Sequence, residues 1–189
     1  LNYSGIIEVE SIIDGSIINF YDAPRFKVKH TYMTANEKLA KDGCYVEVAT
    51  RENHLHVGCG CRIEAYADGK QVLGNRMTSI FGEQCVEFGD IHIEEGKEVE
   101  IVKYVSMYTE RECPAYALHT TVEKEIEQFI ETGFEEERKL HEAVYAQMWE
   151  NADLKITGDA ELNQAIRFNI FHLMSTGNEH DEHVNVGAK

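Results

Sequence analysis

The spacing of apolar residues changes once along this chain of 189 residues, near residue 121. Before that point apolar and polar residues alternate with a period of two, as in half-buried β-strands. After it, apolar residues recur every three or four positions, as on one face of a helix. The chain is therefore predicted to fold as a β domain followed by helices.

The clearest alternating stretch covers residues 54–67. One predicted face carries Leu55, Val57, Cys59, Cys61, Ile63, Ala65 and Ala67; the other carries His54, His56, Gly58, Gly60, Arg62, Glu64 and Tyr66. In residues 99–107, the predicted inward residues are Val99, Ile101, Val105 and Met107, with Glu98, Glu100 and Ser106 outward. Asp-Gly or Glu-Gly pairs separate such stretches and supply the positive φ of tight turns. This pattern favours an antiparallel β-sandwich.

Three helices are predicted, near residues 122–132, 134–151 and 159–176. Gly133 and Gly177 follow the first and third, which suits helix ends. Asp159 is a suitable N-cap for the third helix. That helix has a wide apolar stripe made of Leu162, Ile166, Phe168, Ile170, Phe171, Leu173 and Met174. A stripe this wide is predicted to need cover, either from a second copy or from the preceding helices.

The formal net charge of −16 comes from 34 Asp and Glu against 18 Lys and Arg. Binding to nucleic acid requires a basic surface, so this role is excluded. No apolar run approaches the roughly 20 residues that span a bilayer, so no membrane partner is predicted. The five cysteines are an odd number and lie in predicted strands, which indicates reduced thiols in a cytoplasmic protein.

Three groups of residues could suggest a metal or redox site. The His180–His183 segment reads His-Asp-Glu-His but follows Gly177 and Asn178 in a predicted loop, so a solvated acidic loop is the favoured interpretation. Cys59 and Cys61 share one strand face and are interpreted as core residues. His54 and His56 have no third ligand nearby and are interpreted as surface residues, so no metal site is predicted.

The segment from Asp153 to Lys189 resembles the entry to the catalytic domain of family 65 glycoside phosphorylases, which include maltose, kojibiose, nigerose and trehalose phosphorylases. The matching positions are Asp153, Gly158, Asp159, Gln164, Arg167, Phe168, Phe171, Leu173 and the Val186–Lys189 end. Leu154 and Val186 stand where the family pattern has isoleucine. Upstream, residues 2–5 and 13–19 resemble middle strands of the family's N-terminal domain, and Trp149 resembles its linker tryptophan.

The resemblance implies a galactose-mutarotase-like antiparallel β-supersandwich, a helical linker and an (α/α)₆ barrel. Residues 1–121 would be the later part of the supersandwich, residues 122–157 the linker, and residues 158–189 the first helix and loop of a truncated barrel. The general acid would lie beyond Lys189, so no catalytic residue is assigned here and the substrate-binding residues are unknown. The implied activity uses no cofactor, because inorganic phosphate is the co-substrate that cleaves α-linked glucose disaccharides.

Two alternatives stay open at this point. The parent could be a family 65 hydrolase, because the residues that separate it from a phosphorylase lie beyond Lys189. The chain could instead be a free-standing carbohydrate-binding sandwich, although such a module has no use for three amphipathic helices. The resemblance also leads us to expect a homo-oligomer.

Overall fold

The computed structural model describes residues 2–20 and 27–177, and it divides the chain into two compact units, residues 1–134 and 135–189. The described part of the first unit contains ten strands: β1 (Gly5–Asp14), β2 (Asn19–Phe20), β3 (Lys27–Val28), β4 (Thr31–Lys38), β5 (Cys44–Thr50), β6 (His56–Ala67), β7 (Lys70–Gln71), β8 (Leu73–Phe81), β9 (Gln84–Ile93) and β10 (Glu100–Thr109). A short 3₁₀ turn (Ala115–Ala117) and helix α1 (Leu118–Thr132) follow β10.

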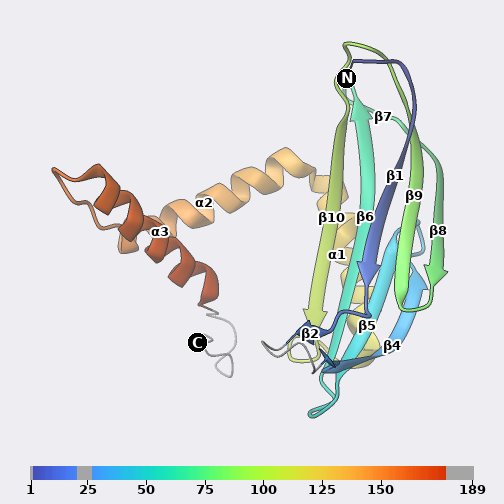
Figure 1. Cartoon of the computed structure of the whole chain (residues 1–189), viewed down its shortest axis with the longest axis horizontal. Coiled ribbons are helices and arrows are strands. Elements are labelled where there is room, and N and C mark those ends of the chain that lie inside the picture. Colours follow the sequence, from blue (N-terminus) through green and yellow to red (C-terminus); the bar gives the residue numbers. More distant parts are fainter. Residues whose placement is uncertain (1, 21–26, 178–189) are drawn as a thin grey trace. The chain divides into compact units, whose positions relative to one another are not determined.

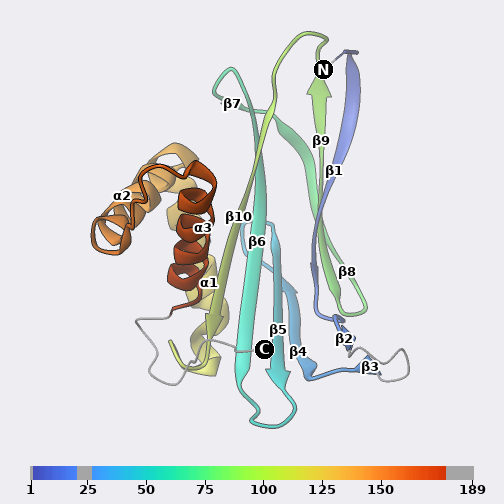
Figure 2. The ribbon, with the colours of Figure 1, turned by 60° about the vertical axis from the view of Figure 1, so that its left-hand side comes forward.

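The strands form two main sheets that face each other (Figure 1; Figure 2). The smaller sheet has the order β1-β9-β8, and the larger has the order β10-β6-β5-β4, with β7 paired to β6. β2 and β3 form a separate pair. Every strand pair in the described residues is antiparallel, and no helix interrupts residues 44–108. The predicted antiparallel β-sandwich is confirmed.

The core between the sheets comes from the alternating residues that the sequence singled out. Ile63 and Ala65 of β6 pack with Ile91 of β9, and Ile7 of β1 packs against them. Farther along β6, Cys61 packs with Cys44, Cys85 and Val46. Of the predicted core face of residues 54–67, Cys61, Ile63 and Ala65 are buried, whereas Val57, Cys59 and Ala67 are half-buried. The opposite face of β6 is also covered, since Gly58, Gly60 and Glu64 are buried. His54 and Leu55 precede this strand, and His54 has φ 53° in the turn that leads into it.

Helix α1 covers the outer face of the larger sheet. Its Val122 and Ile126 are fully buried against Tyr45, Val102 and Tyr104. Gly60 of β6 makes this approach possible, because a Cβ there would lie 2.5 Å from Val122 Cγ1. The helix starts at Leu118, four residues earlier than predicted, and ends before Gly133 at φ 82°.

The prediction for β10 was wrong about which face is buried. Val102, Tyr104 and Ser106 are buried under α1, and the Ser106 hydroxyl donates to Glu125 of that helix. The predicted inward residues Ile101, Val105 and Met107 do face the side of the smaller sheet, yet they are 44%, 48% and 61% exposed. The physical reason is that α1 covers one face of β10, whereas the smaller sheet is too narrow to cover the other.

The second unit contains α2 (Phe134–Ala152) and α3 (Ala160–Thr176), close to the predicted ranges. The Asp159 side chain accepts a hydrogen bond of 2.9 Å from the Leu162 amide, so the predicted N-cap of α3 is confirmed. The rings of Tyr145 on α2 and Phe171 on α3 lie 6.0 Å apart. The third helix thus contacts the second, but the predicted cover is not complete. Leu162, Phe168 and Leu173 of its apolar stripe remain 47%, 61% and 65% exposed, and α3 has no buried residue.

Candidate functional site

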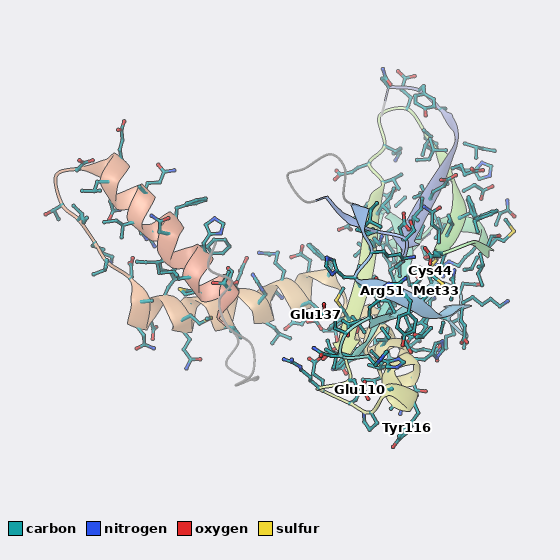
Figure 3. All side chains as sticks on the ribbon, turned by 60° about the horizontal axis from the view of Figure 1, so that its bottom comes forward. Met33, Cys44, Arg51, Glu110, Tyr116 and Glu137 are labelled. Carbon is teal, nitrogen blue, oxygen red and sulfur yellow. The ribbon has the colours of Figure 1, made fainter. Side chains whose placement is uncertain are left out.

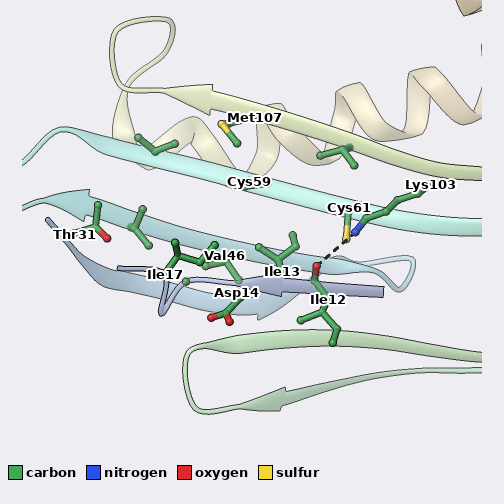
Figure 4. A pocket seen from close by; sticks show the side chains of 14 residues that line it. Ile12, Ile13, Asp14, Ile17, Thr31, Val46, Cys59, Cys61, Lys103 and Met107 are labelled. Carbon is green, nitrogen blue, oxygen red and sulfur yellow. Dashed lines mark hydrogen bonds between the residues drawn. The ribbon is translucent and has the colours of Figure 1, made fainter. Parts of the chain in front are cut away.

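A cavity of about 380 Å³ opens between β1 and β10, on the side where the smaller sheet ends (Figure 4). Most of its lining is aliphatic or sulfur-containing: Ile12, Ile13, Ile17, Val46, Val48, Val57, Cys59, Cys61, Val105 and Met107. The cavity extends along the same β10 face that lacks a covering strand. Such a surface suits an apolar partner rather than a sugar, whose hydroxyls need polar groups.

Two charged residues also line this cavity. Lys103 of β10 reaches across the opening and donates to the Ile12 carbonyl of β1, over 3.5 Å (Figure 4). Asp14 accepts hydrogen bonds from the Ser16 hydroxyl (2.6 Å) and from Gln84 Nε2 (2.9 Å). The hydrogen bond from Ser16 is the main reason why the pKa of Asp14 is lowered. Asp14 therefore stays ionised, which does not suit a general acid at neutral pH.

The cysteine pair predicted for β6 lies at the inner end of the cavity. Cys61 is fully buried, and its sulfur lies 3.4 Å from the Ser11 hydroxyl, whereas Cys59 is half-buried and burial raises its pKa. Cys44, shown among the core side chains in Figure 3, lies directly opposite Cys61 in the strand register. All five cysteines of the chain are free. These thiols pack as small apolar residues, in agreement with the core interpretation.

A buried group of charged residues joins the two sheets where β5 begins, next to the Cys44–Cys61 pair of the ladder. Beyond Cys61, β6 has no β5 residue beside it, so the Ile63 peptide groups need other partners. Glu87 of β9 accepts from the Ile63 amide at 2.9 Å, and Arg76 of β8 donates to the Ile63 carbonyl. Arg76 also forms ion pairs with Glu87 (3.2 Å) and Glu64 (3.1 Å). Side chains of the smaller sheet thus form the hydrogen bonds with Ile63 that a neighbouring strand of the larger sheet would otherwise form.

Glu87 has the protonation behaviour of a general acid but not the position of one. Burial raises its pKa to about 7, in the range that acid catalysts use. Its side chain is 0% exposed, however, and it is held between the Ile63 amide and Arg76. Because no substrate can reach the Glu87 carboxyl, its role is structural: it connects β9 to Ile63 of β6 and to Arg76 of β8.

Sequence reasoning missed this charged group, although a signal was present. Cys85, Glu87 and Ile91 belong to the same alternating face of β9, so the sequence places a charge at a core position. The partner Arg76 sits beside Asn75, which has φ 43°, in a bulge between Gly74 and Met77. That bulge could not be predicted from the pattern of apolar residues.

The two histidines considered as metal ligands contact different residues. His54, in the turn, contacts the Tyr32 hydroxyl at 3.1 Å. His56, on β6, lies 2.8 Å from a carboxylate oxygen of Glu47. In residues 2–20 and 27–177 no cluster of three or more potential metal ligands occurs. The His180–His183 segment and the Val186–Lys189 end lie outside the described residues.

The family-like residues of the second unit meet at the junction of its two helices. Arg167 of α3 forms an ion pair with Asp153 at 3.0 Å, and its guanidinium lies 5.0 Å from the centre of the Trp149 ring. Asn163 accepts from the Ile156 amide and so fixes the connection before α3. Arg167, Asp153 and Trp149 therefore have a structural role in joining α2 to α3.

Residues 1–148 match the family described as "Glycosyl hydrolase family 65, N-terminal domain". The chain belongs to glycosyl hydrolase family 65. The match covers the whole β-sandwich, α1 and most of α2. The resemblance suggested by the sequence is thereby confirmed, and so is the β-sandwich expected for this family's N-terminal domain.

Several relatives are phosphorylases. The chain is 37% identical to kojibiose phosphorylase of Thermoanaerobacter brockii over 193 residues, which cover 100% of this chain and 25% of that protein. It is 27% identical to α,α-trehalose phosphorylase of the same organism, with 100% and 24% covered. Maltose phosphorylase of Bacillus subtilis is 33% identical over 49% of this chain and 12% of its own length. The chain thus spans about a quarter of the length of these kojibiose and trehalose phosphorylases, which it matches throughout. In its described part, no helix meets the length and hydropathy needed to cross a membrane.

Proposed function

We propose that this chain is the non-catalytic N-terminal part of an inverting glycoside phosphorylase that acts on α-linked glucose disaccharides with phosphate. The observation that carries this proposal is the match to kojibiose phosphorylase, which extends over the entire chain but only a quarter of the relative. Relatives named for trehalose and maltose phosphorolysis support the same class of reaction. They also leave the glucosidic linkage of the substrate open.

The proposed reaction needs one carboxylic acid to protonate the glycosidic oxygen and a nucleophile on the opposite face of the sugar. Phosphate is already an anion, so the enzyme has to position it rather than deprotonate it. In this proposal the general acid lies beyond Lys189. Residues 1–121 belong to the supersandwich, residues 122–157 form the linker, and residues 158–189 begin the catalytic barrel. The reaction as proposed requires no organic cofactor or metal.

The positions of the acidic residues support a non-catalytic role for the described part. Glu64 is buried and forms ion pairs with Arg62 (2.9 Å) and Arg76, so it is not available to a sugar. Glu87 is enclosed in the same group. Tyr116, which projects from the surface in Figure 3, is 89% exposed and is not among the residues that line the cavity.

The test compares the purified 189-residue chain with the full-length protein to which it belongs. Both are incubated with kojibiose, nigerose, maltose and trehalose, with and without inorganic phosphate. We expect the full-length protein to release β-glucose 1-phosphate from at least one disaccharide, because inversion converts an α-linkage into a β-phosphate. We expect the 189-residue chain to release nothing above the blank.

Three outcomes would contradict parts of this proposal. Turnover by the homogeneous 189-residue chain would place catalytic groups within it. Release of free glucose by the full-length protein at the same rate without phosphate would make it a hydrolase. Release of α-glucose 1-phosphate would show retention instead of inversion.

A further inference from the structure

We infer that Cys61 and Cys44 form a redox pair: a small hydroperoxide that enters the cavity oxidises the Cys61 thiol, and Cys44 then closes a disulfide between β6 and β5. The oxidising substrate of this site is a hydroperoxide, of which hydrogen peroxide is the smallest. Both thiols are free in the structure and lie in the core, so the inference adds a chemical step to a cluster that the fold already contains. It is independent of the reaction proposed for the full-length protein.

The strand register places the two cysteines where a disulfide can form. Cys44, the first residue of β5, lies directly opposite Cys61 of β6 in an antiparallel ladder, so both side chains are on the same face. Directly opposite residues in such a ladder have Cα atoms about 4.5 or 5.5 Å apart, and disulfides join residues whose Cα atoms are about 4.4–6.8 Å apart. Bond formation therefore requires side chains to rotate, but no strand has to change its partner.

The other cysteines near this pair are less well placed to react with Cys61. Cys85 belongs to the same cluster but comes from β9 of the facing sheet, and its sulfur donates to the Glu37 carbonyl at 3.4 Å. Cys59 lies on the same strand as Cys61 and has no cysteine opposite it in its ladders with β5 and β10. Cys44 is therefore the thiol that closes the disulfide.

The surroundings of Cys61 favour its thiolate, which is the reacting form of a cysteine. A hydrogen bond with Cys44 is the main reason why the pKa of Cys61 is lowered, although burial opposes this shift. The Ser11 hydroxyl, 3.4 Å from the sulfur, and the Lys103 ammonium also lower the pKa of Cys61. The hydrogen bond with Cys61 raises the pKa of Cys44. Cys61 therefore reacts first, and Cys44 keeps its proton until the second step.

The cavity supplies a route for the oxidant. Cys59 and Cys61 both contribute to its wall, and Lys103 lies beside Cys61 (Figure 4). The cavity volume of about 380 Å³ is roughly ten times the 30 Å³ or so that one water molecule occupies in the liquid. Cys61 itself is 0% exposed, so an oxidant reaches its sulfur only when neighbouring side chains move. This selects hydrogen peroxide, which is little larger than water, over a bulky oxidant such as oxidised glutathione.

Both chemical steps balance without a cofactor. In the first step, the Cys61 thiolate attacks one peroxide oxygen and the O–O bond breaks; Cys61 becomes a sulfenic acid, and the leaving hydroxide takes up a proton to form water. In the second step, the Cys44 sulfur attacks the Cys61 sulfur and the S–O bond breaks, so that the hydroxyl leaves as water with the Cys44 proton. The two sulfurs together lose two electrons, and the peroxide is reduced to two molecules of water.

Peptide mass spectrometry of the 189-residue chain after treatment with hydrogen peroxide tests the inference. We expect the peptides that contain Cys44 and Cys61 to be linked, with the loss of two hydrogen atoms, and to separate again with dithiothreitol. Oxidised glutathione should form this link at least about tenfold more slowly, because it is too large to reach the buried sulfur. In urea, hydrogen peroxide should give a mixture of pairings, because only the folded chain fixes the register. Free thiols in the peroxide-treated folded chain, or a link to Cys85 instead, would overturn the inference.

Two alanine variants test the order of the steps. In Cys44→Ala the sulfenic acid has no partner, so dimedone added together with urea should label Cys61 in this variant and leave it nearly unlabelled in wild type. Cys85→Ala is the matched control, because Cys85 is as fully buried and belongs to the same cluster, and it should still form the Cys44–Cys61 link. Equal labelling of Cys61 in wild type and Cys44→Ala would contradict the role of Cys44. The linked peptide is measured on wild type alone and decides the inference even if a variant fails to fold.

A second pair of variants tests the route through the cavity. Val105→Trp places a large ring at the cavity wall and should slow the oxidation of Cys61 at least about fivefold. Ile101→Trp is the matched control: Ile101 lies on the same face of β10 and is 44% exposed, against 48% for Val105, but it does not line the cavity. Equal rates in the two variants would overturn the proposed route. None of these measurements involves turnover of a sugar, so their failure and the failure of the proposed function are distinguishable.

Discussion

Replacing Glu87 with glutamine should change how the stability of the β-sandwich depends on pH. The glutamine carbonyl can still accept from the Ile63 amide, which Glu87 does at 2.9 Å. The substitution removes the titrating group at this fully buried position, and Arg76 keeps its ion pair with Glu64 at 3.1 Å. The change therefore isolates the cost of ionising a carboxyl in the core.

The sign and size of the effect follow from the pKa of Glu87. Burial raises this pKa from 4.5 to about 7, so the folded protein binds the proton more tightly than the unfolded chain. The stability that Glu87 contributes is fully present below pH 4.5 and is lost as the pH rises to 7. A difference of this size corresponds to about 3 kcal/mol. The Glu87→Gln variant should therefore gain about 3 kcal/mol relative to wild type between pH 4.5 and pH 7.5.

Urea unfolding followed by the β-sheet circular dichroism signal measures this difference at a series of pH values. The slopes of the unfolding curves should agree between the two proteins, so that midpoints can be compared. Glu10→Gln, on the exposed face of β1, is the matched control for the loss of one negative charge. The reasoning would be refuted if the stability difference between the two proteins did not change over this pH range. It would also be refuted if the variant lost stability relative to wild type as the pH rose. Attraction from Arg76 would then outweigh the cost of burial.

Two further predictions concern single contacts. Gly60→Val should destabilise the first unit by about 1–3 kcal/mol in urea, because its Cβ would lie 2.5 Å from Val122 Cγ1 and 3.0 Å from Ile126 Cδ1; an unchanged midpoint would show that α1 does not pack here. Asp159→Ala should cost α3 about 1 kcal/mol, because it removes the cap on the Leu162 amide. Asp159→Ser should retain most of that stability, and equal losses in both variants, measured by thermal circular dichroism, would contradict a capping role.

The sequence alone determined the class of fold. Alternation with a period of two placed Cys61, Ile63 and Ala65 of β6 on one inward face, because successive side chains of a strand point to opposite sides. The Asp68-Gly69 pair connects β6 and β7 with positive φ at both residues, as the turn dipeptide predicted. The change to helical spacing placed α2 and α3 close to their observed limits. The motif around Arg167 identified the family, which the match over residues 1–148 then confirmed.

The described residues do not test the division into domains or the position of the catalytic residues. A boundary near residue 158, a barrel that starts with α3 and a general acid beyond Lys189 remain proposals. They rest on resemblance, because the residues that perform the reaction in this proposal are not in the chain. The free-standing binding module is weakened by the match over α1 and most of α2, which ties these helices to the family.

Only the tertiary structure decided which face of β10 is buried and how isolated charges are paired. Alternation in β10 gives two apolar faces, and the sequence cannot tell which of them a helix will cover. The structure buries Val102 and Tyr104 under α1 and leaves Val105 exposed, since the smaller sheet ends at β1. Likewise, Glu87 and Arg76 lie eleven residues apart and meet only because β8 and β9 pair around a bulge. Local pattern fixes the period of a strand, whereas burial depends on neighbours that are distant in sequence.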